Sequence, residues 1–168
     1  ATLDAMVDAT LSFARDSNSS EPWRRTDVAA LLASIVDDME DAGLAVTMQP
    51  AEPVVLECQP SGLRRAVTNL VDNAIKYGTR ARVELRVSPA TIQIIIDDDG
   101  PGIPPDHLRR VFEPFHRVED SRNPTTGGTG LGLAIAQTIA AAHDGTITLS
   151  NRPHGGLRAL LELPRSAR

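Results

Sequence analysis

The sequence has little cysteine and few aromatic residues: one Cys, one Trp, one Tyr and three Phe among 168 residues. A single thiol cannot form an internal disulfide, so Cys58 is expected to pack as a small apolar side chain in a reducing compartment. No apolar run is long enough to cross a bilayer. The chain starts within a helical pattern and without Met, so we expect it to be a piece of a longer protein.

Strong positive charge and metal-binding spacing are also missing. The formal net charge is −5, and no basic run with interleaved aromatic residues is present, so a nucleic-acid partner is not expected. No His, Cys and Glu set has zinc-site spacing. A hydrophobic content of 41% with 23% charged residues is typical of one globular domain.

The order of predicted elements indicates an α+β fold. Apolar spacing of three and four residues predicts helices, and alternation predicts strands. Helices are expected at residues 1–17, 27–42, 60–77, 105–111 and 130–143. Strands are expected at residues 44–49, 54–57, 80–87, 91–97, 145–150 and 157–163. No β-α-β-α-β alternation occurs, so the sequence predicts a two-layer α/β sandwich with a mixed, mainly antiparallel sheet.

One polar edge of the helix at 60–77 holds candidate ligand groups. Asn69, Asn73 and Lys76 fall within an arc of about 60°, with Tyr77 beside them. Amide oxygens suit Mg²⁺, and an ammonium suits phosphate. Taken alone, this edge also fits an ordinary buried polar patch. The adjoining arc is apolar and faces the core through Leu63, Ala66, Val67, Leu70 and Ala74.

Two glycine-rich loops add to this edge. Asp98 ends an apolar strand just before Gly100 and Gly102, where a carboxylate can accept a hydrogen bond from an exocyclic amine and glycines allow close approach of a flat ring. An acidic turn is the alternative for this segment alone. The second loop, residues 128–132, precedes a helix, so its backbone N–H groups can bind an anion. It matches neither the G-x-x-x-x-G-K-[ST] nor the G-x-G-x-x-G motif.

The order of the motifs is more informative than any one of them. An Asn-x₃-Asn helix, Asp-x-Gly-x-Gly, Phe-Glu-Pro-Phe and Gly-x-Gly-x-Gly follow one another within residues 26–164. This order resembles the ATP-binding catalytic domain of sensor histidine kinases, in the superfamily that includes gyrase, Hsp90 and MutL. The resemblance implies the Bergerat α/β sandwich and an ATP:protein-histidine phosphotransferase of two-component signalling.

The resemblance also implies roles for individual residues. Asn73 is expected to ligate Mg²⁺ with help from Asn69, while Lys76 and Tyr77 contact phosphate and ribose. Asp98 is expected to bind the adenine amine. The expected catalytic residues are Asn69, Lys76 and Arg117, which faces the γ-phosphate. The remaining nucleotide-binding set comprises Gly100, Gly102, Ile103, Phe112, Phe115, Gly128, Thr129, Gly130, Leu131, Gly132 and Leu133.

The resemblance further divides the chain. Residues 1–17 are expected to end the second helix of a dimerisation and phosphoacceptor hairpin. Residues 18–25 are a linker, and residues 26–168 are the catalytic domain with an ATP lid at about 117–127, anchored by Phe112 and Phe115. Implied partners are ATP or ADP, a histidine-bearing dimerisation domain of the same protein and a response regulator. We expect a monomeric fragment of a homodimeric, membrane-anchored bacterial sensor whose catalytic domain is cytoplasmic.

Asn69 distinguishes branches of the superfamily. The hydrolytic members carry a water-activating Glu four residues before the metal-binding Asn, and an amide cannot act as that base. Phosphoryl transfer to a histidine outside this chain is therefore expected. The alternatives are an ATPase clamp and a degenerate nucleotide-binding module. The chain's own histidines lack acceptor context and are expected at the surface or in turns: His107, His116, His143 and His154.

Overall fold

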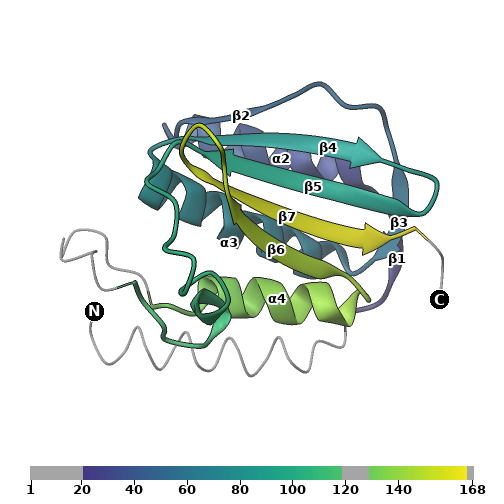
Figure 1. Ribbon diagram of the computed structural model, residues 1–168. Helices are drawn as coiled ribbons and strands as arrows, with labels where there is room; N and C mark the ends of the chain where they lie inside the picture. The colour runs from purple at the N-terminus through teal and green to yellow at the C-terminus, as the bar shows by residue number, and fades with distance from the viewer. Residues whose placement is uncertain (1–20, 119–128, 166–168) are drawn as a thin grey trace.

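A computed structural model describes residues 21–118 and 129–165 of the chain. Within these ranges the chain forms a two-layer α+β sandwich (Figure 1). The main sheet contains β2 (Val46–Met48), β4 (Ala81–Val87), β5 (Thr91–Asp98), β7 (Leu157–Pro164) and β6 (Thr146–Asn151), in that spatial order. Only the β2–β4 pair of this sheet is parallel, so the predicted fold class is confirmed.

Three described helices form the second layer. They are α2 (Val28–Asp41), α3 (Pro60–Gly78) and α4 (Gly132–Ala142). The Asp27 carboxylate accepts a hydrogen bond from the Ala30 amide, as expected of the N-cap of α2. Pro60 opens α3, where its fixed φ favours the first turn and its missing N–H costs nothing. Along its length α3 contacts both α4 and β5, so it is the central helix of the layer.

Strand alternation separates a buried face of the sheet from a charged one. On β5, Ile92, Ile94 and Ile96 belong to the core. Gln93 and Asp97 alternate with them, and Asp97 forms an ion pair with Arg158 of β7. The next strands repeat this pattern, because a residue spacing of two keeps side chains on one face. The sheet therefore has an apolar face covered by helices and an outer face that carries ion pairs, with Ile95 buried among its neighbours.

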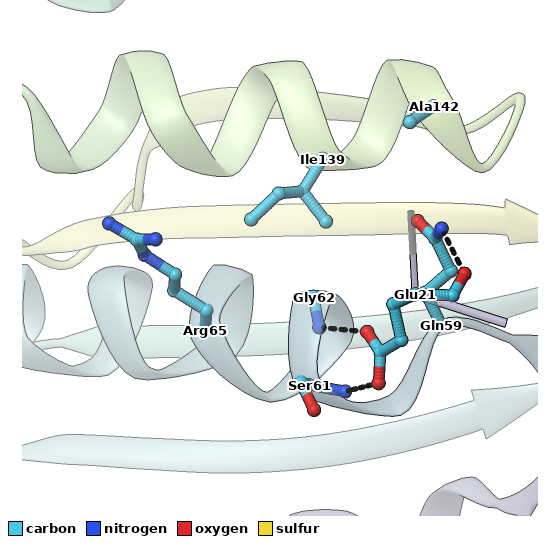
Figure 2. A pocket seen from close by; sticks show the side chains of 7 residues that line it. All are labelled: Glu21, Gln59, Ser61, Gly62, Arg65, Ile139 and Ala142. Atoms are coloured by element: carbon cyan, nitrogen blue, oxygen red, sulfur yellow. Dashed lines mark hydrogen bonds between the residues drawn. The ribbon is translucent and has the colours of Figure 1, made fainter. Parts of the chain in front are cut away.

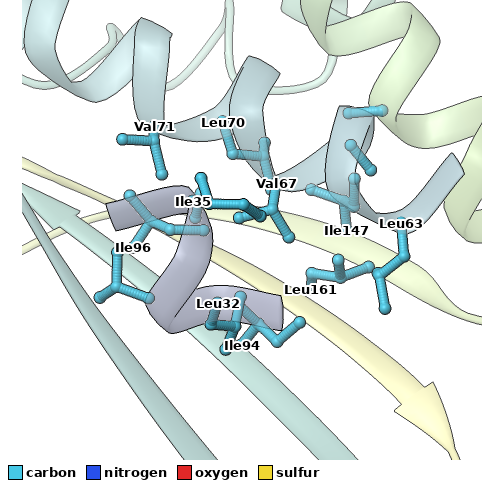
Figure 3. Packing of buried hydrophobic residues seen from close by; sticks show 14 of the residues in the cluster. Leu32, Ile35, Leu63, Val67, Leu70, Val71, Ile94, Ile96, Ile147 and Leu161 are labelled. Carbon is cyan, nitrogen blue, oxygen red and sulfur yellow. The ribbon is translucent and has the colours of Figure 1, made fainter. Parts of the chain in front are cut away.

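The core lies between the inner face of the sheet and the apolar stripes of the helices (Figure 3). Leu32, Leu70, Ile94 and Leu161 are each at most 2% exposed. Burying such a side chain contributes roughly 1.5–3 kcal/mol to folding. Cys58 is fully buried in the same cluster, in agreement with a packing role.

Three local predictions differ from the structure. Residues 24 and 25, predicted as linker, begin β1 (Arg24–Asp27), which pairs antiparallel with β3 (Val55–Cys58). The helix predicted at 105–111 is a series of turns followed by the short 3-10 helix η1 (Arg110–Phe112). His143, predicted at the surface or in a turn, is only 5% exposed. The helix predicted at 1–17 lies outside the described residues.

Candidate nucleotide-binding site

The predicted ligand groups meet because α3 and α4 pack antiparallel. A Cβ placed on Gly132, at the start of α4, would lie 3.8 Å from the Oδ1 atom of Asn69 in the middle of α3. At the other end of the pair, a Cβ on Gly62 would lie 3.7 Å from Ile139. The N-terminus of α4 thus faces the Asn-bearing half of α3. Its backbone N–H groups and positive dipole end suit an anion there.

Asn69 has an unsatisfied donor at this junction. Its Nδ2 atom is buried and has no hydrogen-bond partner within the described part of the chain. A buried amide without a partner costs roughly 1–3 kcal/mol, so this donor is a candidate for a hydrogen bond to a ligand oxygen. Asn73 lies one helical turn further on and is half-buried. The two amides fit an Mg–phosphate group, with Nδ2 as a donor to oxygen and the Oδ1 atoms as metal ligands.

Lys76 and Tyr77 follow on the last turn of α3. The Lys76 Nζ atom lies 4.9 Å from the centroid of the Tyr77 ring, and Tyr77 is 45% exposed. A cation above an aromatic face is stabilised by the ring quadrupole. The pair places a positive charge next to an exposed phenol, on the side chains predicted to contact phosphate and ribose.

Asp98 is a buried carboxylate, 4% exposed, at the end of β5. Its Oδ1 atom accepts hydrogen bonds from the amides of Gly100 (2.8 Å) and Leu157 (2.9 Å). Its Oδ2 atom accepts none from the residues that the structure describes. Gly78 of α3 packs directly on the Asp98 side chain, where a Cβ would overlap it. One oxygen is therefore fixed by the backbone, and the other is available to a donor such as an amine.

The carboxylates flanking Asp98 are neutralised on the outer face of the sheet. Arg158 donates to both oxygens of Asp97, each at 2.7 Å. Burial alone would raise the pKa of Asp97, but these bonds and the charge of Arg152 offset it, so that pKa lies below its ordinary value. Hydrogen bonds from Arg82 lower the pKa of Asp99 to about 2.

The loop after Asp98 is held by close backbone approaches. A Cβ on Gly100 would lie 2.6 Å from the Tyr77 carbonyl oxygen, so only glycine fits there. Gly102 has φ +76° and lies against the Asn151 side chain. The Asn151 amide accepts from Ile103 N (2.8 Å) and donates to Ile103 O (2.7 Å).

The Phe-Glu-Pro-Phe segment and the second glycine loop are joined by backbone contacts. Phe115, with φ +64°, donates its amide to the Gly130 carbonyl at 3.0 Å. Gly130 has φ +71°, and a Cβ there would lie 2.9 Å from Phe115 Cα. Phe112 packs partly buried against the core. This contact brings together two residues that flank the predicted lid in sequence.

The remaining predicted residues divide into described and undescribed ones. Leu131 is 1% exposed and is the N-cap residue of α4, and Leu133 packs partly buried against the core. Their side chains therefore anchor the start of α4 to the core. Thr129 is half-buried, and Arg117 is exposed. Gly128 and residues 119–127 of the predicted lid lie outside the described residues.

A separate surface cavity of about 320 Å³ lies at the opposite end of α3 and α4 (Figure 2). The Glu21 carboxylate accepts hydrogen bonds there from the amides of Ser61 (3.0 Å) and Gly62 (3.1 Å). Glu21 therefore caps the N-terminus of α3, where Gln59 provides no side-chain cap. Burial alone would raise the pKa of Glu21, but these hydrogen bonds outweigh it, so that pKa lies below its ordinary value. This cavity contains none of the predicted ligand groups.

His143 connects several segments at the same end of α3 and α4. Its Nε2 atom accepts the Gln59 amide at 3.0 Å, and its Nδ1 atom donates to the Ile139 carbonyl at 2.8 Å. The Trp23 ring packs on it at a centroid distance of 4.9 Å. His143 is thus a structural residue that joins α4, α3 and the segment before β1.

Sequence reasoning missed Asn151 and Arg152, which belong to the β6–β7 hairpin. The Arg152 Nη1 atom donates to the Asp98 carbonyl at 2.7 Å. The run Asn-Arg-Pro-His-Gly-Gly carried a turn signal only. No short-range pattern relates position 151 to position 103, because register across three strands creates that contact.

Fold and side chains together define the class of protein: a two-layer sandwich with amide, carboxylate and glycine groups gathered along α3, at the end of β5 and at the start of α4. A family model for histidine kinase-, DNA gyrase B- and HSP90-like ATPases matches residues 58–167. The chain belongs to this family. Within the described ranges, no helix has the length and apolarity that crossing a membrane requires.

Known proteins of similar sequence are sensor kinases. The sensor histidine kinase GtrS of Pseudomonas aeruginosa is 40% identical over 164 residues, covering 97% of this chain and 33% of GtrS. CpxA of Escherichia coli is 36% identical over 169 residues, covering 96% of this chain and 37% of CpxA. The chain thus spans about a third of the length of these relatives.

A solved structure supports the fold. The ATP binding domain of PrrB from Mycobacterium tuberculosis superposes with a TM-score of 0.71 at 33% identity. The match covers 86% of this chain and 98% of that domain.

Proposed function

We propose that this chain is the ATP-binding catalytic domain of a sensor histidine kinase. It binds ATP with Mg²⁺ and presents the γ-phosphate to a histidine on a dimerisation domain outside this chain. Family membership and similarity to sensor histidine kinases support this function. The arrangement of α3, α4 and β5 supplies groups suited to each part of the nucleotide.

Each group has a distinct role in the proposal. Asp98 Oδ2 accepts the adenine amine. Lys76 and Arg117 bring positive charge to the phosphates, and the amides at the start of α4 bind their oxygens. Asn73 and Asn69 would hold Mg²⁺, which when bound neutralises phosphate charge. Catalysis by the chain's own residues then consists of positioning the γ-phosphate and stabilising its charge.

The single observation that carries the proposal is the buried Asp98 carboxylate, with one oxygen fixed by two amides and the other without a partner among the described residues. Its neighbours Asp97 and Asp99 have arginine partners, whereas Asp98 has no ion pair within the described part of the chain. A buried acceptor of this kind favours a ligand that offers a hydrogen-bond donor, such as an exocyclic amine.

Nucleotide titration of the 168-residue chain tests this assignment. Removing a hydrogen bond to a charged group costs about 1.5–3 kcal/mol, so Asp98→Ala should weaken ATP and ADP binding by roughly ten- to a hundredfold. Asp98→Asn should also reduce the preference for ATP over GTP. Glu84→Gln, on the outer face of β4, is the matched control and should bind as the parent does. Unchanged affinity in Asp98→Ala would remove Asp98 from the site.

Two alternative functions are an ATPase clamp and a degenerate nucleotide-binding module. Asn69 stands where the hydrolytic relatives carry Glu, which favours phosphoryl transfer over hydrolysis. The motif residues are intact, which favours a working kinase over a degenerate module. Rapid ATP turnover by the chain would support the clamp, and failure to bind Mg·ATP would support the module.

The proposal extends to the whole protein. Residues 1–17 would end the dimerisation and phosphoacceptor hairpin, residues 18–25 would include the linker, and residues 26–168 would form the catalytic domain. Phosphate would pass from the acceptor histidine to a response regulator. The full-length protein would be a homodimer with its catalytic domain in the cytoplasm, and the isolated chain would be a monomer.

A further inference from the structure

The β6–β7 hairpin touches the loop after β5 at several points outside the family motifs. Asn151 ends β6, and its amide exchanges two hydrogen bonds with the Ile103 backbone, at 2.8 and 2.7 Å. This reciprocal pair satisfies one donor and one acceptor of an irregular loop. The pair holds the peptide between Gly102 and Ile103 in place. Gly102 itself has φ +76°, a conformation that favours glycine. Asn151 therefore fixes the far end of the Asp98–Ile103 loop.

Arg152, the next residue, fixes the near end. Its Nη1 atom donates to the Asp98 carbonyl at 2.7 Å and lies 3.4 Å from Asp99 Oδ1. Its Nε atom lies 3.5 Å from Asp97 Oδ2. One guanidinium thus contacts three consecutive residues, which its rigid, planar set of donors favours over the flexible ammonium of lysine.

Strand register explains why the hairpin reaches the loop. Asn151 pairs with Leu157, and Leu157 N donates to Asp98 Oδ1 at 2.9 Å. Gly156 packs on the Asp98 carbonyl so closely that a Cβ would overlap it. The adjacent row, in which Arg158 pairs with Ser150 and Asp97, belongs to the outer face. The hairpin therefore contacts Asp98 at both its carboxylate and its carbonyl.

From these contacts we infer that Asn151 and Arg152 are positioning residues that determine base selectivity. They hold the Asp98 carboxylate and the Gly100–Gly102 backbone at the spacing that an adenine ring requires. This inference rests on the proposed nucleotide-binding function. Neither side chain is required to touch the nucleotide, and their effect passes through the loop that they hold.

The consequence is specific to the base. Adenine offers an amine to Asp98, whereas guanine presents a carbonyl oxygen at the same position. A carboxylate held in place accepts a hydrogen bond from the adenine amine and repels the guanine carbonyl oxygen. If the loop moves, the hydrogen bond to adenine and the repulsion of guanine both weaken, so ATP binding weakens and GTP binding strengthens. Phosphate groups bound at α3 and α4 are not affected.

The experiment measures binding of ATP, GTP and inorganic triphosphate to the 168-residue chain by calorimetry in Mg²⁺ buffer. Asn151→Ala removes two hydrogen bonds and should lower the ATP-to-GTP affinity ratio about tenfold. Arg152→Lys should lower it in the same direction. Triphosphate affinity should stay unchanged in both variants. Ser150→Ala on β6 and Arg86→Lys, whose partner Glu84 is far from the loop, are the matched controls.

The outcomes separate the inference from the proposed function. If the parent chain binds no nucleotide, the proposed function fails and the inference fails with it. If Asp98→Asn loses selectivity but Asn151→Ala and Arg152→Lys keep it, only the inference is wrong. An equal loss for all three probes would show a general structural role and would also overturn it. If Asn151→Ala does not fold, Asn151→Asp, which keeps the acceptor toward Ile103 N, gives the same test.

Discussion

Asn73 is a half-buried amide on the polar edge of α3, one turn from the unsatisfied Nδ2 of Asn69. Its oxygen is the ligand that we assign to Mg²⁺. Asn73→Ala should therefore abolish the Mg²⁺ dependence of ATP binding, measured by titration with and without EDTA. Thr68→Ala lies about 140° around the helix and should retain that dependence. Full Mg²⁺ dependence in Asn73→Ala would contradict the assignment.

Asp99 gives the sheet edge a predictable response to acid. Hydrogen bonds from Arg82 lower its pKa to about 2 in the folded chain, below the ordinary value of 3.8. A depressed folded pKa stabilises the protein at pH values above the unfolded pKa, and this contribution is lost as the pH falls from about 4 to about 2. Urea unfolding at several pH values should show a flatter acid limb for Asp99→Asn than for the parent.

The control for this titration is Asp37→Asn, because Asp37 is exposed on α2 and itself forms no ion pair among the described residues. It should reproduce the acid limb of the parent. An Asp99→Asn curve that is parallel to the parent curve between pH 5 and pH 2 would mean that the Arg82 pair does not hold in solution.

At the residue scale, the sequence predicted what a local motif encodes. Asn69, Asp98 and Gly100 were identified because their spacing carries chemistry. The structure places Asn69 in the middle of α3 and places Asp98 and Gly100 against the C-terminal end of that helix. The buried position of His143 was not predicted, since its partners Trp23 and Gln59 are distant in sequence. A polar residue at a helix end is most often exposed, and only tertiary contacts reverse that expectation.

At the element scale, α3 contains two glycines with opposite requirements. Gly78 lies in the helix with its α-carbon against Asp98, and a Cβ there would overlap the carboxylate. The left-handed residue that ends the helix is Thr79, with φ +65°. Gly78 is thus required for close packing on Asp98, and the helix ends at Gly78 with Thr79 as its C-cap. A Cβ on Gly62 would meet only ordinary contacts at 3.7 Å.

The surroundings of the two glycines predict that replacement by alanine has opposite effects on stability at the two positions. Gly62→Ala should stabilise the chain by up to about 1 kcal/mol, because alanine favours a helix over glycine. Gly78→Ala should destabilise it by about 1–3 kcal/mol through overpacking and should weaken ATP binding by displacing Asp98. Chemical denaturation and nucleotide titration measure both effects. Equal stability of the two variants would contradict the packing of Gly78 on Asp98.

The predicted and observed boundaries of helices and strands agree closely where the apolar pattern extends over many residues. The predicted helix at 60–77 and the observed α3 differ by one residue. Strand β1 was missed because Arg-Arg-Thr-Asp has neither alternation nor an apolar side chain, and pairing with β3 alone makes it a strand. The turns at 105–109 replaced a predicted helix, since a short run can be pulled from helical geometry by tertiary contacts.

At the scale of the whole molecule, fold class was predictable but strand order was not. Periodicity identifies strands without stating their neighbours, and the order β2-β4-β5-β7-β6 depends on contacts far apart in sequence. That order puts the β6–β7 hairpin beside the loop after β5. Positioning residues such as Asn151 therefore become visible only in three dimensions, whereas the motif residues that they support are visible in one.

The histidines of the chain bear on what the whole molecule can do alone. His143 is buried, and both of its ring nitrogens are hydrogen-bonded. The Nδ1 atom of His107 lies 3.2 Å from the Nε2 atom of His116. His154 is exposed in the β6–β7 turn but lacks an acceptor sequence context. Asn69 cannot activate water as the Glu of hydrolytic relatives does. We therefore predict that the chain provides the donor site and that none of these four histidines is an acceptor.

The isolated chain should accordingly bind ATP, hydrolyse it negligibly and remain unphosphorylated. Incubation with γ-labelled ATP should leave no acid-labile phosphate on the chain, because none of its four histidines has an acceptor sequence context. Adding a histidine-bearing dimerisation hairpin of a sensor kinase should produce acid-labile label on the hairpin, and Asp98→Ala should prevent this. The same hairpin with its histidine replaced by Gln is the control. Label on the 168-residue chain alone would identify one of its four histidines as an acceptor and would contradict the proposed division between donor and acceptor domains.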